Sequence, residues 1–482
     1  IILALVLALS FVACSKNSDK NDNSNSKSTT KATETTTEVK SVDLDLTELS
    51  STVVYSEVYN MLITPDDYKG KIIKMKGQFN QYTDEETGKI HNAVIIPDAT
   101  ACCQQGLEFE LSDKTNPNFE QNTEITVVGT FDTYSDGKFL YCHLKNAKII
   151  NELKSLNNKK IVVTGATGLI GSVLCKSVLC ANRLYNCNIT IYAVVRNMSK
   201  AQKIFENVIG RQEFNIVNYD FMGNDSFEIP DNIDYLIHTA AVTTSKLMVE
   251  KPVDTLFTAI NGTNAILKFA RKNKVSSVVY LSSMEVYGSF SDEKYVDENT
   301  YGRIDILDVR SSYSEGKRIC ENICVSYNHQ YNVPVKIVRL AQTFGPGITK
   351  EDNRVYAQFA RSVIEENDIV LHTRGLSEGN YVYISDAINA IFKVLMYGKD
   401  GEAYNIANEE SHMQIRQMAE LVAEKVAKGK IRVIYDLQSN NAYAKDTKMK
   451  IDTHKIKELG WKPRVSLYDT YIRMIDYIKE MA

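Results

Sequence analysis

Tyr313 and Lys317 are the two side chains in this sequence whose types and spacing most directly suggest chemistry. The residues from 313 to 327 have a helical pattern, and a separation of four places both side chains on one helix face, about one turn apart. A nearby ammonium favours the phenolate, so we expect Lys317 to lower the pKa of Tyr313 from about 10 toward neutral pH. Such a phenol could exchange a proton with a carbinol or carbonyl oxygen.

A glycine-rich segment, Thr164-Gly-Ala-Thr-Gly-Leu-Ile-Gly171, lies between a predicted buried strand at 160–163 and a helical pattern at 172–180. Glycines at such a turn allow a tight bend, close approach of the backbone to a diphosphate, and close packing of helix on strand. The helix N-terminus also favours an anion. The segment therefore predicts a dinucleotide-binding turn.

This turn resembles the T-G-x-x-G-x-x-G fingerprint of the extended short-chain dehydrogenase/reductase family, the NAD-dependent epimerase/dehydratase group. The resemblance runs from about residue 159 to residue 479. Strand-like runs and helical patterns alternate from 159 to 482, which predicts an α/β fold with a doubly wound, Rossmann-type parallel sheet. The resemblance implies a small C-terminal substrate-binding part, mainly 342–482. It also implies an enzyme that acts on a nucleotide-diphosphate sugar by transient or net hydride transfer, and a possible homodimer.

The segment Ser282-Ser-Met-Glu-Val-Tyr-Gly288 resembles the S-S-x-x-V-Y-G motif of the same family. The resemblance places Ser283 where it hydrogen-bonds the reacting oxygen, which would polarise a carbonyl without adding charge. It implies that Lys317 also holds the nicotinamide ribose. Family dehydratases carry adjacent Asp and Glu where this chain has Met284 and Glu285. We therefore do not expect 4,6-dehydration, whereas epimerisation, decarboxylation and simple reduction stay open, and Glu285 is either catalytic or a backbone hydrogen-bond acceptor.

The cofactor site combines the glycine turn with residues that follow the next strands. Arg196 stands where a carboxylate would bind the adenosine ribose, and its guanidinium could instead bracket a 2′-phosphate, which favours NADP over NAD; a solvated surface arginine is the alternative. Asp220 resembles an adenine-contacting Asp, and Ala240 and Ala241 end an H-x-A-A motif. The predicted cofactor-binding residues are Gly165, Thr167, Gly168, Leu169, Ile170, Gly171, Arg196, Asp220, Ala240, Ala241 and Lys317.

Substrate contacts are expected from Met284 and Gln342, the latter replacing the Asn of the family's R-x-x-N-V-Y-G-P motif. An amide one methylene longer can still donate to a diphosphate, with a different reach. Gly379 stands where an Arg usually grips the diphosphate. This departure favours a second hypothesis, a membrane-anchored lipoprotein whose fold binds a dinucleotide without turnover and whose N-terminal barrel binds a ligand.

The first fourteen residues form an apolar run that is too short to span a bilayer and is typical of a signal peptide. Phe11-Val-Ala-Cys14 resembles the lipobox of bacterial lipoproteins, which implies an acylated Cys14 and a membrane anchor. Residues 15–41 are polar and predict a disordered linker. The lack of a leading Met and of a positively charged start suggests that a few residues precede this sequence.

Strand-like runs separated by Gly, Asn and Asp predict a small antiparallel β-barrel of the OB type over 42–150. Its Cys102, Cys103, Cys142 and His143 have ligand types suited to Zn²⁺. Vicinal cysteines rarely bind one ion together, however, and strand alternation sends Cys142 and His143 to opposite faces. We therefore expect no metal, and instead buried or redox-active thiols.

The composition limits the partners. With 44% hydrophobic and 24% charged residues most of the chain should be globular, and a formal net charge of −4 gives no reason to expect nucleic acid as a partner. The two ends imply different compartments, because an acylated Cys14 would export a domain whose nucleotide-sugar substrate and dinucleotide are cytoplasmic. We expect a cytoplasmic 159–482 domain, and hence either an unusual fusion or a mis-joined reading frame.

Overall fold

The structure is a computed structural model that describes most of the chain beyond Ser41. The predicted signal peptide with Cys14, the linker 15–41, and Cys102 and Cys103 lie outside the described residues and stay predictions. Two compact units divide the chain: one within residues 1–76, 81–116 and 128–147, the other within 77–80, 117–127 and 148–482. The described residues are 42–84, 87–97, 104–112, 114, 117, 121–122, 124–136, 139–150, 156–223, 226–290, 294–349, 352–437 and 446–481.

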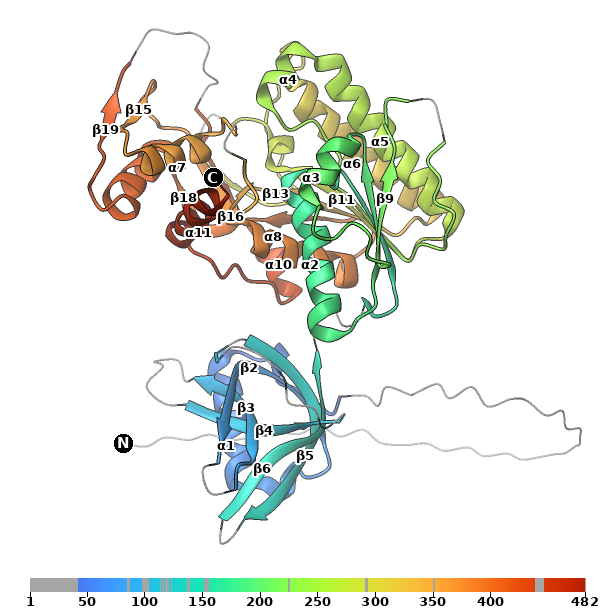
Figure 1. Ribbon diagram of the computed structural model, residues 1–482, viewed down its shortest axis with the longest axis vertical. Helices are drawn as coiled ribbons and strands as arrows, with labels where there is room; N and C mark the ends of the chain where they lie inside the picture. Colours follow the sequence, from blue (N-terminus) through green and yellow to red (C-terminus); the bar gives the residue numbers. More distant parts are fainter. Residues whose placement is uncertain are drawn as a thin grey trace, which may run out of the picture. The chain divides into compact units, whose positions relative to one another are not determined.

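The N-terminal part of the chain forms a six-stranded sheet with the order β1-β2-β3-β4-β6-β5 (Figure 1). A further pairing between β2 and β5 closes this sheet. Its strands are β1(Leu44–Asp45), β2(Ile72–Thr83), β3(Ile90–Pro97), β4(Gln104–Leu111), β5(Glu124–Asp136) and β6(Phe139–Ile150), with helix α1(Ser51–Ile63) before β2. The strands overlap the apolar runs that predicted them. The expected all-antiparallel pairing is wrong in two places, because β1 runs parallel to β2 and β4 runs parallel to β6. Strand β5 lies between β4 and β6 in sequence and carries the chain back, so that β6 repeats the direction of β4.

A seven-stranded sheet forms the centre of the second unit, in the order β17-β13-β11-β10-β7-β8-β9. Every pairing in it is parallel. The strands are β7(Lys160–Thr164), β8(Thr190–Val195), β9(Phe214–Asn218), β10(Tyr235–His238), β11(Ser277–Ser283), β13(Val335–Leu340) and β17(Ala403–Ile406). The chain winds outward from β7 in both directions, which confirms the predicted doubly wound Rossmann-type sheet and places its switch point between β7 and β10.

Helices cover both faces of this sheet, as parallel strands buried on both sides require. On one face α2(Leu169–Tyr185) and α8(Ile384–Tyr397) share an apolar core with the sheet. On the other face α5(Pro252–Asn273) and α6(Ser311–Tyr331) pack together over a second core. Shorter helices are α3(Met198–Ile204), α4(Ser245–Glu250) and α10(His454–Glu458). Within the described residues, no helix is both long enough and apolar enough to cross a membrane.

A smaller part with its own apolar core follows β13. In this core the rings of Phe344 and Tyr356 stack with centroids 4.3 Å apart. The part contains the three-stranded sheet β14(Gln342–Phe344), β16(Glu378–Tyr383), β18(Asn408–Gln414), the pair β15(Ile369–Leu371) and β19(Val433–Tyr435), and the helices α7(Val355–Glu365), α9(Ile415–Leu421) and α11(Leu467–Glu480). A further strand pair joins β12(Lys294–Val296) to β20(Met449–Ile451).

Asp386 in α8 anchors the C-terminal tail. Its carboxylate accepts hydrogen bonds from the backbone N–H groups of Arg464 (2.9 Å) and Val465 (3.0 Å), and its carbonyl accepts one from the indole N–H of Trp461 (3.0 Å). Burial raises the pKa of this carboxyl, although the two backbone donors act against the rise. The tail residues are therefore structural.

We expect Asp386→Ala to lower the free energy of unfolding by about 2 to 4 kcal/mol, because two buried backbone donors lose a carboxylate acceptor. Urea unfolding followed by circular dichroism measures this. Asp476→Ala, at an exposed site on α11, is the control and should change stability by less than about 0.5 kcal/mol. Equal effects of the two substitutions would contradict the anchoring role.

Candidate functional site

The glycine turn between β7 and α2 has the geometry that its sequence predicts. Gly165 has φ +64°, and a Cβ there would lie 2.7 Å from the Ala240 Cα. A Cβ on Gly171 would lie 2.5 Å from the Gly165 carbonyl oxygen. Neither position can therefore hold a larger residue without a backbone shift.

Gly168 is the N-cap residue of α2, and no side chain caps this helix end. The residue is exposed, so the first N–H groups of the helix are open to an incoming group. These groups and the positive end of the helix dipole suit a diphosphate. The structure thus fits a dinucleotide here, with Thr167, Leu169 and Ile170 beside Gly168.

His238 holds the end of β10 against this turn. Its Nδ1 lies 2.7 Å from the Thr164 hydroxyl oxygen, which in turn accepts the Ala240 backbone N–H at 3.3 Å. Burial, and then the charge of Lys317, lower the pKa of His238 to about 3. The imidazole is therefore neutral, and it acts as a packed residue that positions the loop with Ala240 and Ala241.

Arg196 and Asp220 follow the two strands on the other side of β7. Arg196 is exposed directly after β8. Asp220 comes after β9, and its carboxylate accepts the backbone N–H of Met222 at 3.0 Å, which fixes a turn. Because the carboxyl ends of parallel strands share one edge of the sheet, both residues lie at the same edge as the glycine turn.

Lys317 is buried on α6, and only 4% of the residue is exposed. Its Nζ donates to the Leu281 carbonyl at 2.6 Å and lies 4.8 Å from the centre of the Tyr280 ring and 5.9 Å from that of Tyr313. Burial lowers the pKa of Lys317 to about 8. The structure therefore brings the Tyr–Lys pair together on one helix face, with the ammonium tied to β11.

The pKa of Tyr313 is raised rather than lowered, which corrects our expectation. Burial is the largest cause and the charge of Glu285 is the next, while hydrogen bonding to Ser283 and the charges of Arg310 and Arg354 act against it. The Lys317 ammonium donates its hydrogen bond to the Leu281 carbonyl at 2.6 Å. The sequence showed the spacing of the pair but not these surroundings.

Glu285 lies in a short helical turn, Met284–Tyr287, directly after β11. Its backbone N–H donates to the Ser283 hydroxyl at 3.2 Å, and its carboxylate lies 3.0 Å from the Arg310 guanidinium. The Ser314 hydroxyl donates to the same carboxylate at 3.2 Å. The contacts of the Glu285 carboxylate therefore come from the side chains of Arg310 and Ser314 and not from the backbone, and its catalytic role stays a prediction.

Arg310 and Arg354 are site residues that the sequence analysis missed. Arg310 lies three residues before Tyr313, and this spacing in the sequence could have indicated that the two side chains are close. The guanidinium carbon of Arg310 is 6.0 Å from the centre of the Tyr313 ring. Arg354 precedes α7 and is paired with Asp352. No local pattern links Arg354 to Tyr313, because only the tertiary fold brings these two residues within reach of each other's charge.

The predicted substrate residues have different surroundings. Gln342 is exposed at the start of β14, directly after β13. Met284 is half-buried and packs against the main apolar core. Gly379 has open space where a side chain would be, and Arg361 donates to the Asp352 carbonyl instead of occupying that space.

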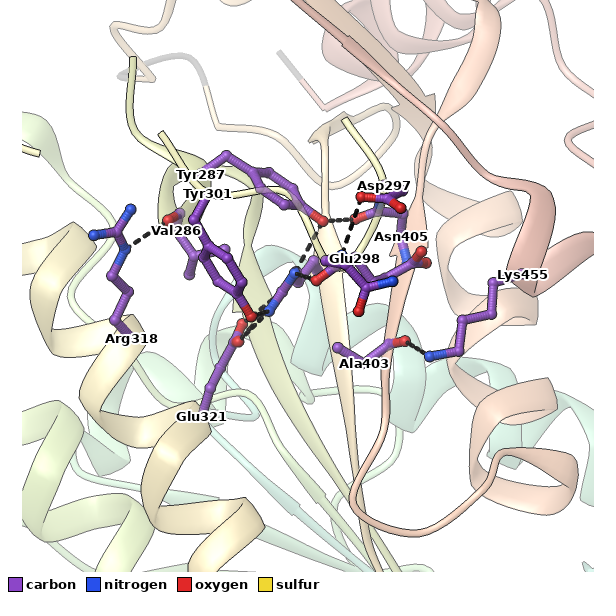
Figure 2. Close-up of polar contacts among 12 residues, drawn as sticks. Val286, Tyr287, Asp297, Glu298, Tyr301, Arg318, Glu321, Ala403, Asn405 and Lys455 are labelled. Carbon is purple, nitrogen blue, oxygen red and sulfur yellow. Dashed lines mark hydrogen bonds and ion pairs between the residues drawn. The ribbon is translucent and has the colours of Figure 1, made fainter. Parts of the chain in front are cut away.

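A buried guanidinium connects the elements that carry the site. Arg339 on β13 lies 2.7 Å from the Glu321 carboxylate on α6, one turn beyond Lys317, and it donates to the Tyr287 hydroxyl at 3.1 Å and the Glu298 carbonyl at 2.8 Å. Figure 2 shows Glu321, Tyr287, Tyr301 and Glu298, which surround this guanidinium. Burial alone would lower the pKa of Arg339, but the hydrogen bonds and charge of Glu321 raise it. This network fixes α6 relative to the turn that holds Ser283 and Glu285.

The N-terminal unit shows no metal cluster among its described residues. The Cys142 thiol is buried and directed to the Met61 carbonyl at 3.7 Å, and burial raises its pKa. His143 lies on the opposite side of β6, as strand alternation predicts.

Comparison with family models matches residues 161–407 to the NAD dependent epimerase/dehydratase family. The curated UDP-glucuronic acid decarboxylase 1 of Xenopus tropicalis is 28% identical over 330 residues, which cover 68% of this chain and 74% of that protein. The dTDP-D-glucose 4,6-dehydratase of Homo sapiens is 25% identical over 328 residues, covering 67% and 90%.

Two solved structures show the same fold. One is a UDP-glucuronic acid 4-epimerase of Bacillus cereus in complex with UDP-glucuronic acid and NAD, with a TM-score of 0.57, 22% identity, and coverage of 67% of this chain and 100% of that one. The other is a UDP-N-acetylglucosamine 4-epimerase of Methanobrevibacter ruminantium, with a TM-score of 0.58, 19% identity, and coverage of 68% and 100%.

We expect the stability cost of burying Lys317 to depend on pH. The folded chain releases this proton near pH 8, whereas the unfolded chain releases it near pH 10.5, so the unfolded state binds more protons between these values. The contribution of Lys317 to stability should therefore rise as pH rises through this window. Relative to the unsubstituted protein, Lys317→Met should be most stabilising at pH 7 and less so at pH 10, as measured by urea unfolding. Parallel pH profiles would contradict this, and Lys176→Met, at an exposed site on α2, controls for the lost charge.

Proposed function

The chain belongs to the NAD dependent epimerase/dehydratase family, whose members are enzymes of the extended short-chain dehydrogenase/reductase type, and on this premise we propose that it oxidises a carbinol of a nucleotide-diphosphate sugar by transient or net hydride transfer. One observation supports this above the others. Ser283 and Tyr313 interact at the same edge of the sheet as the glycine turn, and Lys317 lies beneath them. Proton transfer and dinucleotide binding can therefore meet at one place.

The roles of the side chains follow from their surroundings. In its phenolate form Tyr313 would take the proton of the sugar hydroxyl as the C–H bond is broken, and Ser283 would donate a hydrogen bond to the same oxygen as it becomes a carbonyl. The bound nicotinamide supplies the hydride acceptor. Arg310 and Arg354 supply positive charge that favours the phenolate form of Tyr313 against burial. The hydrogen bond from Lys317 to the Leu281 carbonyl fixes helix α6 against strand β11. Lys317 is also the residue that would hold the nicotinamide ribose.

The reaction that fits best is epimerisation or decarboxylation rather than 4,6-dehydration. Met284 cannot protonate a leaving hydroxyl, and the Glu285 carboxylate is engaged by Arg310 and Ser314. UDP-glucuronic acid appears in the names of both a decarboxylase and a 4-epimerase to which the chain is similar. We therefore propose UDP-glucuronic acid as the first substrate to test.

We also propose a fold for the N-terminal unit and a location for the protein. The strand order β2-β3-β4-β6-β5, with β2–β5 closure, supports an OB-type barrel for the N-terminal unit. Membrane attachment through an acylated Cys14 is proposed from the lipobox resemblance. A cytoplasmic location for residues 159–482 follows from the proposed substrate.

Tyr313→Phe should reduce turnover by at least about 100-fold, because the general acid/base is lost. Turnover is measured by mass spectrometry of UDP-glucuronic acid incubated with the purified full chain and NAD, and dinucleotide affinity is measured separately by calorimetry. Tyr327→Phe, on the same helix with its hydroxyl bound to Asn264, is the matched control and should keep its rate. If the unsubstituted protein binds NAD but converts no nucleotide sugar, including dTDP-glucose and UDP-glucose, the non-catalytic lipoprotein hypothesis replaces this one.

We propose that Arg196 gives the site an affinity for NADP in addition to the NAD of its family. Arg196→Ala should then weaken NADP binding by about 10- to 100-fold, the loss of a charged hydrogen-bond pair, while NAD binding stays unchanged. Calorimetric titration of both dinucleotides measures this, with Lys200→Ala on α3 as the control. An equal loss of affinity for both dinucleotides would show that Arg196 does not bind the 2′-phosphate.

A further inference from the structure

Glu108 on β4 accepts hydrogen bonds from three side chains that lie on three other strands, β2, β3 and β5. The Tyr134 hydroxyl donates at 2.6 Å, the His91 Nδ1 lies at 3.1 Å, and the Tyr82 hydroxyl also donates to the carboxylate. Burial alone would raise the pKa of Glu108, but these hydrogen bonds lower it. A charged carboxylate is thus held at the centre of a ring of aromatic side chains. We call the group formed by Tyr82, His91, Glu108, Tyr134, Tyr141 and His143 the Glu108 cluster.

The Glu108 cluster lies on the outer face of the closed sheet. Leu107 and Phe109 are buried on either side of Glu108, so strand alternation directs Glu108 outward. The same alternation around Cys142 and Leu144 directs Tyr141 and His143 outward on β6, the parallel neighbour of β4, where Glu108 is paired with His143. Strands β2 to β6 therefore all contribute to one surface.

Two stacked ring pairs form flat platforms on this surface. The rings of Tyr82 and His91 are 4.9 Å apart and inclined by 7°, and those of Tyr134 and Tyr141 are 5.3 Å apart and inclined by 15°. Tyr82 is 45% exposed and Tyr141 is 37% exposed. Burying an aromatic ring is among the largest gains in stability available to a small domain. Ring faces that stay exposed are therefore better explained by ligand binding than by a structural role.

The charges around the Glu108 cluster restrict the class of ligand. Residues 42–150 contain roughly twice as many acidic residues as lysines and no arginine, which disfavours a polyanion such as a nucleic acid. The Lys89 ammonium lies 5.2 Å from the centre of the Tyr134 ring and would repel a second cation there. Flat aromatic faces beside a carboxylate and an imidazole suit a neutral molecule with both apolar C–H faces and hydroxyl groups.

We propose that the Glu108 cluster is a binding site for a neutral saccharide. Sugar rings stack on Tyr82 and Tyr141, and their hydroxyls donate to the Glu108 carboxylate, which has a remaining acceptor position. The His143 ring, half-buried and without a hydrogen-bond partner among the described residues, supplies a further contact. This site goes beyond the proposed function, because its ligand needs no nucleotide and its residues lie in the other unit.

The test uses the full chain and three neutral probes: cellohexaose, maltohexaose and N-acetylchitohexaose. Saturating UDP-glucuronic acid is present throughout, so that the nucleotide-sugar site is occupied. We expect at least one probe to show saturation-transfer NMR signals and a calorimetric Kd. Tyr82→Ala and Tyr141→Ala, both at exposed positions, should each weaken this binding at least tenfold, and Glu108→Gln should weaken it as well.

Glu110→Gln is the matched control, because Glu110 lies two residues along β4 on the same outer face and is exposed. It should leave the Kd unchanged. Circular dichroism verifies that each variant is folded, and the two tyrosine variants keep the proposal falsifiable if Glu108→Gln unfolds. The proposal is overturned if no probe binds, if binding survives both tyrosine substitutions, or if a single-stranded oligonucleotide binds at this face in place of the saccharides. A failure of UDP-glucuronic acid turnover would overturn only the proposed function.

Discussion

The buried ion pair between Arg339 and Glu321 is the interaction on which the geometry of the catalytic edge depends. It joins the strand β13 to the helix α6, and the Arg339 guanidinium also holds Tyr287 and the Glu298 carbonyl. Removing one member of a buried pair leaves an uncompensated charge, at a cost of about 3 to 5 kcal/mol. Because Glu321 is one helical turn from Lys317 on α6, a shift of this pair would also move Lys317 and Tyr313.

Burial has opposite consequences for the two members of the Tyr–Lys pair. It raises the pKa of Tyr313 and lowers that of Lys317, so in both cases the neutral form is favoured. Two surrounding cations, Arg310 and Arg354, act against the rise in the pKa of Tyr313. The half-buried phenol is thus surrounded by charges from several elements and not by Lys317 alone.

The two units bring different kinds of chemistry into one chain. The second unit combines a glycine turn with a Tyr–Lys pair on one helix face, and the N-terminal unit presents stacked tyrosines around a carboxylate. Comparisons identify the family of the second unit alone, since the matched residues are 161–407. The chemistry of the Glu108 cluster therefore rests on its own residues.

Local sequence determined the parts of this protein whose physics is local. The glycine turn, the four-residue spacing of Tyr313 and Lys317, and the alternating buried runs were predicted correctly, because steric limits and helix and strand periodicities act over a few residues. Only the tertiary structure decided which charges surround the phenol. Arg354 reaches Tyr313 across elements far apart in sequence, and the three donors to Glu108 come from three different strands. The pKa of a buried group depends on burial and on all neighbouring charges, and neither is encoded by spacing along the chain.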